Sequence, residues 1–75
     1  MIRNVDNYRF GDNLYNAIKK RGLKHREVAE MIDVSEESIS RWCNGGSLPY
    51  LGYIIKLKNA LGCTLDELVE GVEKQ

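Results

Sequence analysis

The sequence predicts an all-α fold in which five short helices form one compact bundle. Apolar residues recur at steps of three and four, and glycine, proline and an Asn-Gly pair interrupt that period. No stretch alternates apolar and polar residues as a strand would. A chain of 75 residues suits one small domain. We expect a single domain over residues 1–75, with an ordered core of about 8–70 between a short flexible N-terminal arm and C-terminal tail.

The first helix is expected over about residues 8–20. Phe10, Leu14 and Ile18 follow one another at four-residue steps, so their side chains form one apolar stripe. Gly22 can adopt the left-handed conformation that ends a helix, and it therefore supplies the stop signal.

A second helix over about residues 24–32 and a third over about residues 36–43 are separated by a short turn. Asp33 lies in that turn, and aspartate is one of the few residues that accepts a left-handed backbone conformation. Ser35 is a strong N-cap candidate for the third helix, because its hydroxyl can accept a hydrogen bond from a free backbone N–H.

The fourth and fifth helices complete the predicted bundle. Pro49 favours the start of the fourth helix, whose broad apolar face runs over residues 51–61 and which ends at Gly62. The fifth helix is short, from about residue 65 to 69, and Thr64 is placed to cap its N-terminus.

The charged residues are unevenly distributed although the chain has 11 Lys and Arg against 11 Asp and Glu. Residues 1–26 hold seven basic and two acidic residues, a net charge of +5, and the remainder holds four against nine, a net charge of −5. The densest basic cluster lies at residues 19–26. Two interpretations stay open: this cluster is a solvated helix end, or it forms a face that meets an anion.

Several classes of protein are excluded by what the sequence lacks. No run of 18 apolar residues and no charged-then-apolar leader is present, so we expect a cytoplasmic protein with no membrane partner. Cys43, Cys63 and His25 do not make a zinc ligand set, and we expect no metal, cofactor or small-molecule ligand. No acid, base and nucleophile occur together, and the glycine-rich residues 44–47 follow a helix rather than a strand, so no enzyme is expected.

Residues 24–44 have the layout of two short helices joined by a turn, from which a second helix can enter the major groove of DNA. Over about residues 10–69 the chain also resembles the lambda-repressor-like family of bacterial and phage regulators, the Cro and XRE type. The fragments that carry the resemblance are Gly22-Leu23, Glu27-Val28-Ala29-Glu30, Val34-Ser35, Ser38-Ile39-Ser40-Arg41-Trp42, Asn44-Gly45, Leu48-Pro49, Leu51, Ile54-Ile55-Lys56-Leu57, Ala60-Leu61-Gly62 and Leu65-Asp66-Glu67-Leu68.

This resemblance implies a five-helix domain that binds double-stranded DNA, with the helix-turn-helix formed by helices 2 and 3. It places the base-contacting residues on the third helix: Glu36, Glu37, Ser40 and Arg41. It places the phosphate-contacting residues at Lys24, His25, Ser35 and Asn44. Arg41 is the best candidate for direct readout, because a guanidinium can bond both O6 and N7 of guanine. Arg3 and Arg9 are further candidates, as a basic arm that reaches an adjacent groove.

The chain departs from the family pattern at one pair of positions. Ile18 and Cys43 stand where the family commonly has an Arg and a Glu that form an interior ion pair. Replacing both members of a buried pair by apolar groups is often neutral or stabilising, whereas losing one leaves an uncompensated charge. We therefore predict that the side chains of Ile18 and Cys43 touch.

Two acidic residues complicate the predicted DNA contact. Glu36 and Glu37 would bring carboxylates into a groove flanked by phosphates, although a carboxylate can accept a hydrogen bond from cytosine N4. The leading hypothesis is a small sequence-specific repressor that acts as a transcriptional regulator by occupying an operator. The alternative is a protein–protein interaction module on the same scaffold with weak or no DNA binding.

Such a regulator is expected to bind as a homodimer, with half-sites about one helical turn apart. Tyr50 and Tyr53, the region from the fourth to the fifth helix and the C-terminal tail are candidates for the dimer surface. The two tyrosines could equally lie at the edge of the core.

Overall fold

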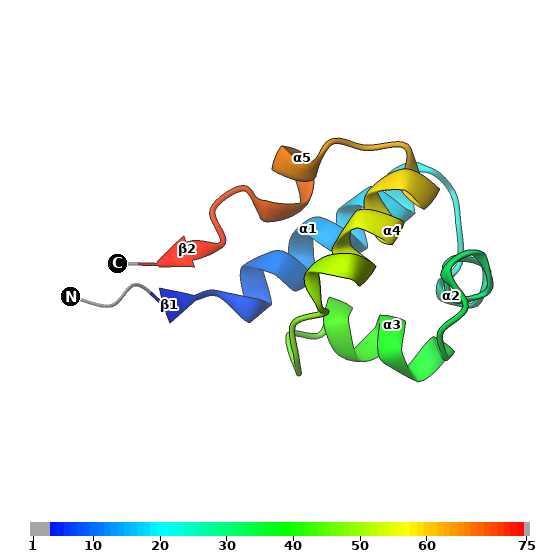
Figure 1. Cartoon of the computed structure of the whole chain (residues 1–75), viewed down its shortest axis with the longest axis horizontal. Coiled ribbons are helices and arrows are strands. Elements are labelled where there is room, and N and C mark those ends of the chain that lie inside the picture. Colours follow the sequence, from blue (N-terminus) through cyan, green and yellow to red (C-terminus); the bar gives the residue numbers. More distant parts are fainter. Residues whose placement is uncertain (1–3, 75) are drawn as a thin grey trace.

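The computed structural model describes residues 4–74 and contains five helices in that range. They are α1 (Asn7–Lys20), α2 (His25–Ile32), α3 (Glu36–Cys43), α4 (Leu51–Leu61) and α5 (Leu65–Val69), arranged as a bundle in Figure 1. The predicted all-α, five-helix fold is confirmed. The expected helix bounds agree with the observed bounds to within one residue.

The five helices pack around one hydrophobic core. α1 contacts α3 and α5, while α2 contacts α3 and α4. Phe10, Leu14 and Ile18, the apolar stripe expected on α1, are all buried in this core. α3 is thus held from two sides, by α1 along the chain's first apolar stripe and by α2 across the turn.

The caps that the sequence indicates are present at the starts of α3 and α5. The Ser35 hydroxyl accepts a hydrogen bond from the Ser38 N–H at 3.1 Å, and the Thr64 hydroxyl accepts one from the Glu67 N–H at 3.1 Å. Asp33, the C-cap of α2, has φ 60° and ψ 51°, and it is the only non-glycine residue with positive φ in the described part of the chain. The left-handed turn predicted at Asp33 is therefore confirmed.

Asp33→Gly is expected to raise the free energy of unfolding by up to about 1 kcal/mol, because glycine adopts positive φ without the steric cost of a Cβ. Removing a negative charge from the C-terminus of α2 acts in the same direction. Urea denaturation measures the change. Asp33→Asn separates the two causes, since it removes the charge and keeps the Cβ. A glycine variant less stable than the native chain would contradict the strain at Asp33.

The two ends of the described chain pair with each other, as Figure 1 shows at the left of the view, where β1 (Asn4–Val5) and β2 (Glu73–Lys74) are labelled. The two strands form an antiparallel ladder. No strand was expected here: residues 4–5 of the predicted arm and residues 73–74 of the predicted tail pair with each other. A ladder of two residues on each side is too short to show a period of two in the sequence.

The C-terminal segment is also tied to α1. The Asp6 N–H donates to the Val72 carbonyl at 2.7 Å, and the Asn13 side-chain amide donates to the Leu68 carbonyl at 2.9 Å. Val72 is 8% exposed, so burial of its side chain adds to these bonds. Arg9 lies within α1 rather than in the segment before it, and its Nε–H donates to the Glu70 carbonyl at 3.1 Å. Arg3, the other candidate for a basic arm, lies outside the described residues.

Among residues 4–74, no helix combines the length and apolar character needed to cross a lipid bilayer.

Candidate nucleic-acid interface

α2, the turn after it and α3 form the helix-turn-helix that the sequence predicts. α2 ends at the left-handed Asp33, and α3 begins two residues later, after the N-cap Ser35. In Figure 1, α2 is seen nearly end-on while α3 runs across the view, so the two contacting helices are not parallel. Ile39 and Trp42 are buried and hold one side of α3 on the body.

The four residues assigned to base contacts lie in the first turn of α3, for Glu36, or on the side away from Ile39 and Trp42, for Glu37, Ser40 and Arg41. Glu36, Glu37 and Arg41 are exposed, and Ser40 is half-buried. Because residues three and four apart lie on one helix face, Glu37, Ser40 and Arg41 are neighbours on the outward side of α3. The structure thus brings these three residues together on one accessible face, with a carboxylate at the N-terminal end and the guanidinium near the C-terminal end.

Arg41 is available to a ligand. The described residues include no ion-pair partner for its guanidinium. Its backbone carbonyl accepts a hydrogen bond from the Gly46 N–H at 2.9 Å, which holds the loop after α3 against the helix end. A Cβ at Gly46 would lie 2.9 Å from the Arg41 Cγ, so glycine leaves room for the aliphatic part of the arginine side chain.

The residues assigned to phosphate contacts lie at helix ends. Lys24 is the exposed N-cap of α2, and its backbone N–H donates to Glu27 Oε1 at 2.8 Å. The next backbone N–H groups, from His25 to Glu27, have no partner within the helix and carry the positive end of its dipole. Asn44, the exposed C-cap of α3, and Ser35, also exposed, lie at the two ends of α3.

The His25 side chain contacts residues of two other helices. Its Nδ1 lies 3.3 Å from the Ser40 hydroxyl oxygen, a hydrogen bond that links α2 to α3. Its ring also meets the Tyr15 ring of α1 edge-on, with centroids 6.3 Å apart. One residue assigned to phosphate and one assigned to bases are therefore joined directly, which the sequence did not reveal because the link depends on how the two helices cross.

The basic cluster at residues 19–26 divides between packing and surface. Arg21 donates to the carbonyls of Leu61, Gly62 and Ala17 and pairs with Glu67 Oε2 at 3.4 Å. It therefore joins α1 to the C-terminus of α4 and to α5, and its charge is not free for an anion. Lys24 and Arg26, in contrast, are exposed at the start of α2.

Both cysteines are free thiols. Burial raises the pKa of the Cys43 thiol to about 11, and burial is also the main cause of a raised pKa for Cys63. Each thiol is therefore held in its neutral form near neutral pH. Within residues 4–74 no group of three or more His, Cys, Asp or Glu side chains is close enough to hold a metal ion.

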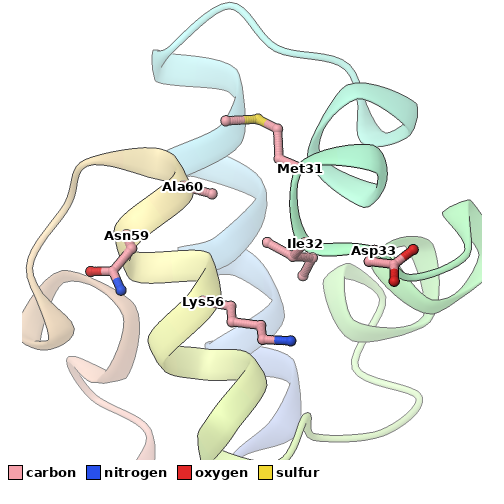
Figure 2. Close-up of a pocket in the computed structure, with 6 residues that line it drawn as sticks. All are labelled: Met31, Ile32, Asp33, Lys56, Asn59 and Ala60. Atoms are coloured by element: carbon pink, nitrogen blue, oxygen red, sulfur yellow. The ribbon is translucent and has the colours of Figure 1, made fainter.

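An open pocket lies away from the outward face of α3, between α2 and α4 (Figure 2). The Ile32 and Ala60 side chains point into it from the two helices, and the Lys56 amine extends across its mouth on the side of Asp33. None of the eight residues assigned to DNA contacts lines this pocket.

An aromatic column runs from the core to the surface at the start of α4. Tyr53 is half-buried, with its ring centroid 5.6 Å from that of the buried Trp42. Tyr50 stacks on Tyr53 at 6.1 Å and is 80% exposed. Tyr53 thus belongs to the edge of the core, and Tyr50 is left on the surface.

Comparison with known proteins agrees with this geometry. A helix-turn-helix family model matches residues 14–68. An uncharacterized HTH-type transcriptional regulator of Rickettsia prowazekii is 24% identical over 74 residues, which cover 99% of this chain and 56% of the relative. The chain therefore spans a little over half the length of this curated relative.

Two solved structures share the arrangement of helices. The restriction-modification controller protein C.AhdI from Aeromonas hydrophila has a TM-score of 0.80 and 25% identity, covering 84% of this chain and 96% of its own. The P22 c2 repressor, solved in complex with a synthetic operator, has a TM-score of 0.76 and 27% identity, covering 83% and 94%. Because the family model spans more than half of the chain, this protein belongs to the helix-turn-helix family, and its resemblance to lambda-repressor-like regulators is confirmed.

Proposed function

We propose that this protein is a sequence-specific, double-stranded DNA-binding transcriptional regulator that reads the major groove with α3. The observation that carries the proposal is the outward face of α3, on which Arg41 is exposed and has no ion-pair partner in the described chain. A helix presented in this way fits the major groove, and a free guanidinium can make two hydrogen bonds to one guanine. Glu36, Glu37 and Ser40 would meet neighbouring base edges.

The N-terminus of α2 is proposed to bind the DNA backbone. Free N–H groups and the positive end of the helix dipole attract a phosphate, and the exposed Lys24 adds a full charge beside them. His25, Ser35 and Asn44 complete the proposed phosphate contacts. These contacts fix the position of α3 on the duplex, and the base contacts supply the specificity.

The regulator is proposed to act as a repressor by occupying its operator as a homodimer. The P22 c2 repressor, which shares the fold, was solved on a synthetic operator. One helix-turn-helix unit contacts few base pairs, so two copies on half-sites about one helical turn apart would read a longer sequence. Tyr50 and the neighbouring Leu51, exposed by 80% and 66%, are the proposed dimer contacts. No catalytic step is part of the proposed function.

A protein–protein interaction module remains the second candidate, and one observation favours it. Glu36 and Glu37 are both exposed at the start of α3, with no ion-pair partner in the described chain, where they would approach phosphates. An acidic helix end of this kind suits a basic protein surface better than a nucleic acid.

Selection of bound duplexes from a random library distinguishes the two candidates. A DNA-binding regulator is expected to enrich one motif, and its affinity for that motif should fall steeply as salt rises. Failure to enrich any motif would favour the protein partner.

Arg41→Ala and Lys24→Ala are expected to weaken binding in different ways. Arg41→Ala should cost about 1 to 3 kcal/mol on duplexes that carry the preferred guanine and little on duplexes that lack it. Lys24→Ala should weaken binding to all sequences alike and reduce the salt slope by about one unit. Salt titrations with matched duplexes measure both effects. Equal loss of specificity in both variants would contradict the assigned roles.

A further inference from the structure

We propose that His25 determines whether the Ser40 hydroxyl accepts or donates a hydrogen bond at the base edge, and so contributes to the choice of base there. The proposal rests on the proposed function, because it requires α3 to lie in the major groove. Its basis is the hydrogen bond between His25 Nδ1 and Ser40 Oγ, 3.3 Å apart, which connects the phosphate-facing end of α2 to the outward face of α3.

The His25 ring is held in place on more than one side. Tyr15 of α1 meets it edge-on, and Ser40 of α3 is hydrogen-bonded to it. Both His25 and Ser40 are half-buried, whereas Glu37 and Arg41 beside Ser40 on α3 are exposed. The pair therefore has a defined geometry before DNA arrives, and binding does not have to order it.

With neutral His25, one proton assignment satisfies all the contacts. A neutral imidazole has one N–H, and a phosphate, which only accepts, selects the form with that proton on Nε2. Nδ1 is then an acceptor, so the Ser40 hydroxyl donates its single proton to Nδ1. Ser40 Oγ presents only lone pairs to the groove, and it accepts from an exocyclic amine such as N4 of cytosine.

Protonation of His25 reverses the role of Ser40. Both ring nitrogens of an imidazolium are donors, so Nδ1 donates to Ser40 Oγ. The hydroxyl proton is released toward the groove, where it can bond an acceptor such as O4 of thymine. Pyrimidines give the clearest contrast, because both purines carry an N7 acceptor in the major groove.

His25 has titratable or charged neighbours on three helices. It is the only histidine of the chain, and in the described residues no carboxylate is hydrogen-bonded to it. The titratable or charged side chains next to it on α2, on α1 and around Ser40 on α3 are Lys24, Arg26 and Glu27, Tyr15 and Lys19, and Glu36, Glu37 and Arg41. Imidazole is the side chain that ordinarily changes charge between about pH 5 and 8.

The experiment uses the full chain and duplexes with the selected motif. Ser40→Ala first identifies the base pair whose preference depends on Ser40. Duplexes with cytosine or deoxyuridine at that position are then compared at about pH 8 and about pH 5.5, which span the range in which imidazole titrates. Deoxyuridine has the O4 of thymine without its methyl group, so in the major groove this pyrimidine differs from cytosine only in its exocyclic group.

The native chain is expected to favour cytosine over deoxyuridine about 2- to 10-fold at the higher pH, the size of one hydrogen bond, and to lose or reverse that ratio at the lower pH. The ratio removes the general gain in affinity that an added positive charge gives on every duplex. His25→Gln is the control: its amide can still donate to a phosphate but does not titrate, so its ratio should not depend on pH.

Two results would overturn the proposal alone: a native ratio that does not change with pH, or the same change in His25→Gln. The proposal would also fail if Ser40→Ala altered no base preference. A selection that enriches no motif would contradict the proposed function, and with it this proposal.

Discussion

Gly11→Ala is expected to lower the free energy of unfolding by about 2 kcal/mol or more, because the added methyl group would enter backbone rather than a movable side chain. Gly11 is buried in α1, facing the end of α3. A Cβ at this position would lie 2.7 Å from the Trp42 carbonyl oxygen and would also collide with the Cys43 carbonyl. The collision exceeds the gain of about 1 kcal/mol that alanine ordinarily brings to a helix interior.

Gly52→Ala is the matched control. Gly52 also lies in a helix, α4, but a Cβ there would have no neighbour within 4 Å. This variant is expected to be as stable as the native chain or more stable by up to about 1 kcal/mol. Urea denaturation followed by the fluorescence of the single, buried Trp42 measures both variants. Equal effects of the two substitutions would show that α1 and α3 do not approach closely at Gly11.

Introducing a charge at Ile18 or at Cys43 alone is expected to destabilise the fold strongly. Introducing opposite charges at both positions is expected to destabilise it only mildly. Ile18 is 2% exposed and Cys43 is 9% exposed, and both belong to the same core. Ile18→Arg or Cys43→Glu alone should cost about 3 to 5 kcal/mol, because each leaves a buried charge without a partner. The double variant should recover a large part of that loss, since the two charges can pair if the side chains touch.

A double-mutant cycle in urea measures this coupling. If a single variant does not fold, circular dichroism replaces the cycle. The double variant is then expected to show the helical signal of a folded protein, which the single variant lacks. Costs that simply add in the double variant would contradict the predicted contact between Ile18 and Cys43.

The helices were predictable because their ends depend on local chemistry. Gly22 and Gly62 both adopt positive φ, Ser35 and Thr64 both cap as expected, and each of these signals can be read from one or two residues. Asp33 shows the same for the turn between α2 and α3, where a polar residue takes a conformation that usually requires glycine.

Contacts between distant parts of the chain were not predictable in the same way. The ladder joins residues 4–5 to 73–74, and neither segment is long enough to show a strand period. Arg21 belongs to the basic cluster that the sequence left as either a solvated helix end or an anion-binding face, but its donors bind the end of α4 and Glu67, 46 positions away. Such roles depend on where the folded chain brings its helix ends.

The candidate interface was predicted through the family resemblance, and the hydrogen bonds within it were not. Composition and periodicity identify an exposed helix after a turn, but they do not choose which of its residues meet bases. The assignment of Arg41 came from the matched motif, and its exposure supports that assignment. The His25–Ser40 bond follows from the crossing of α2 and α3, which no local pattern encodes.

The claim that α3 lies in the major groove is tested most directly by a cycle of two changes. One change replaces a single atom of the DNA, and the other replaces one side chain of the protein. Each guanine of the selected motif is replaced in turn by 7-deazaguanine, which lacks the N7 acceptor, and affinity is measured for the native chain and for Arg41→Ala. One such replacement should weaken the native chain and leave Arg41→Ala nearly unchanged, because the lost acceptor and the lost guanidinium belong to the same contact. Independent, additive losses at every guanine would show that Arg41 does not bind N7 of a guanine in the motif and would contradict the proposed bidentate readout.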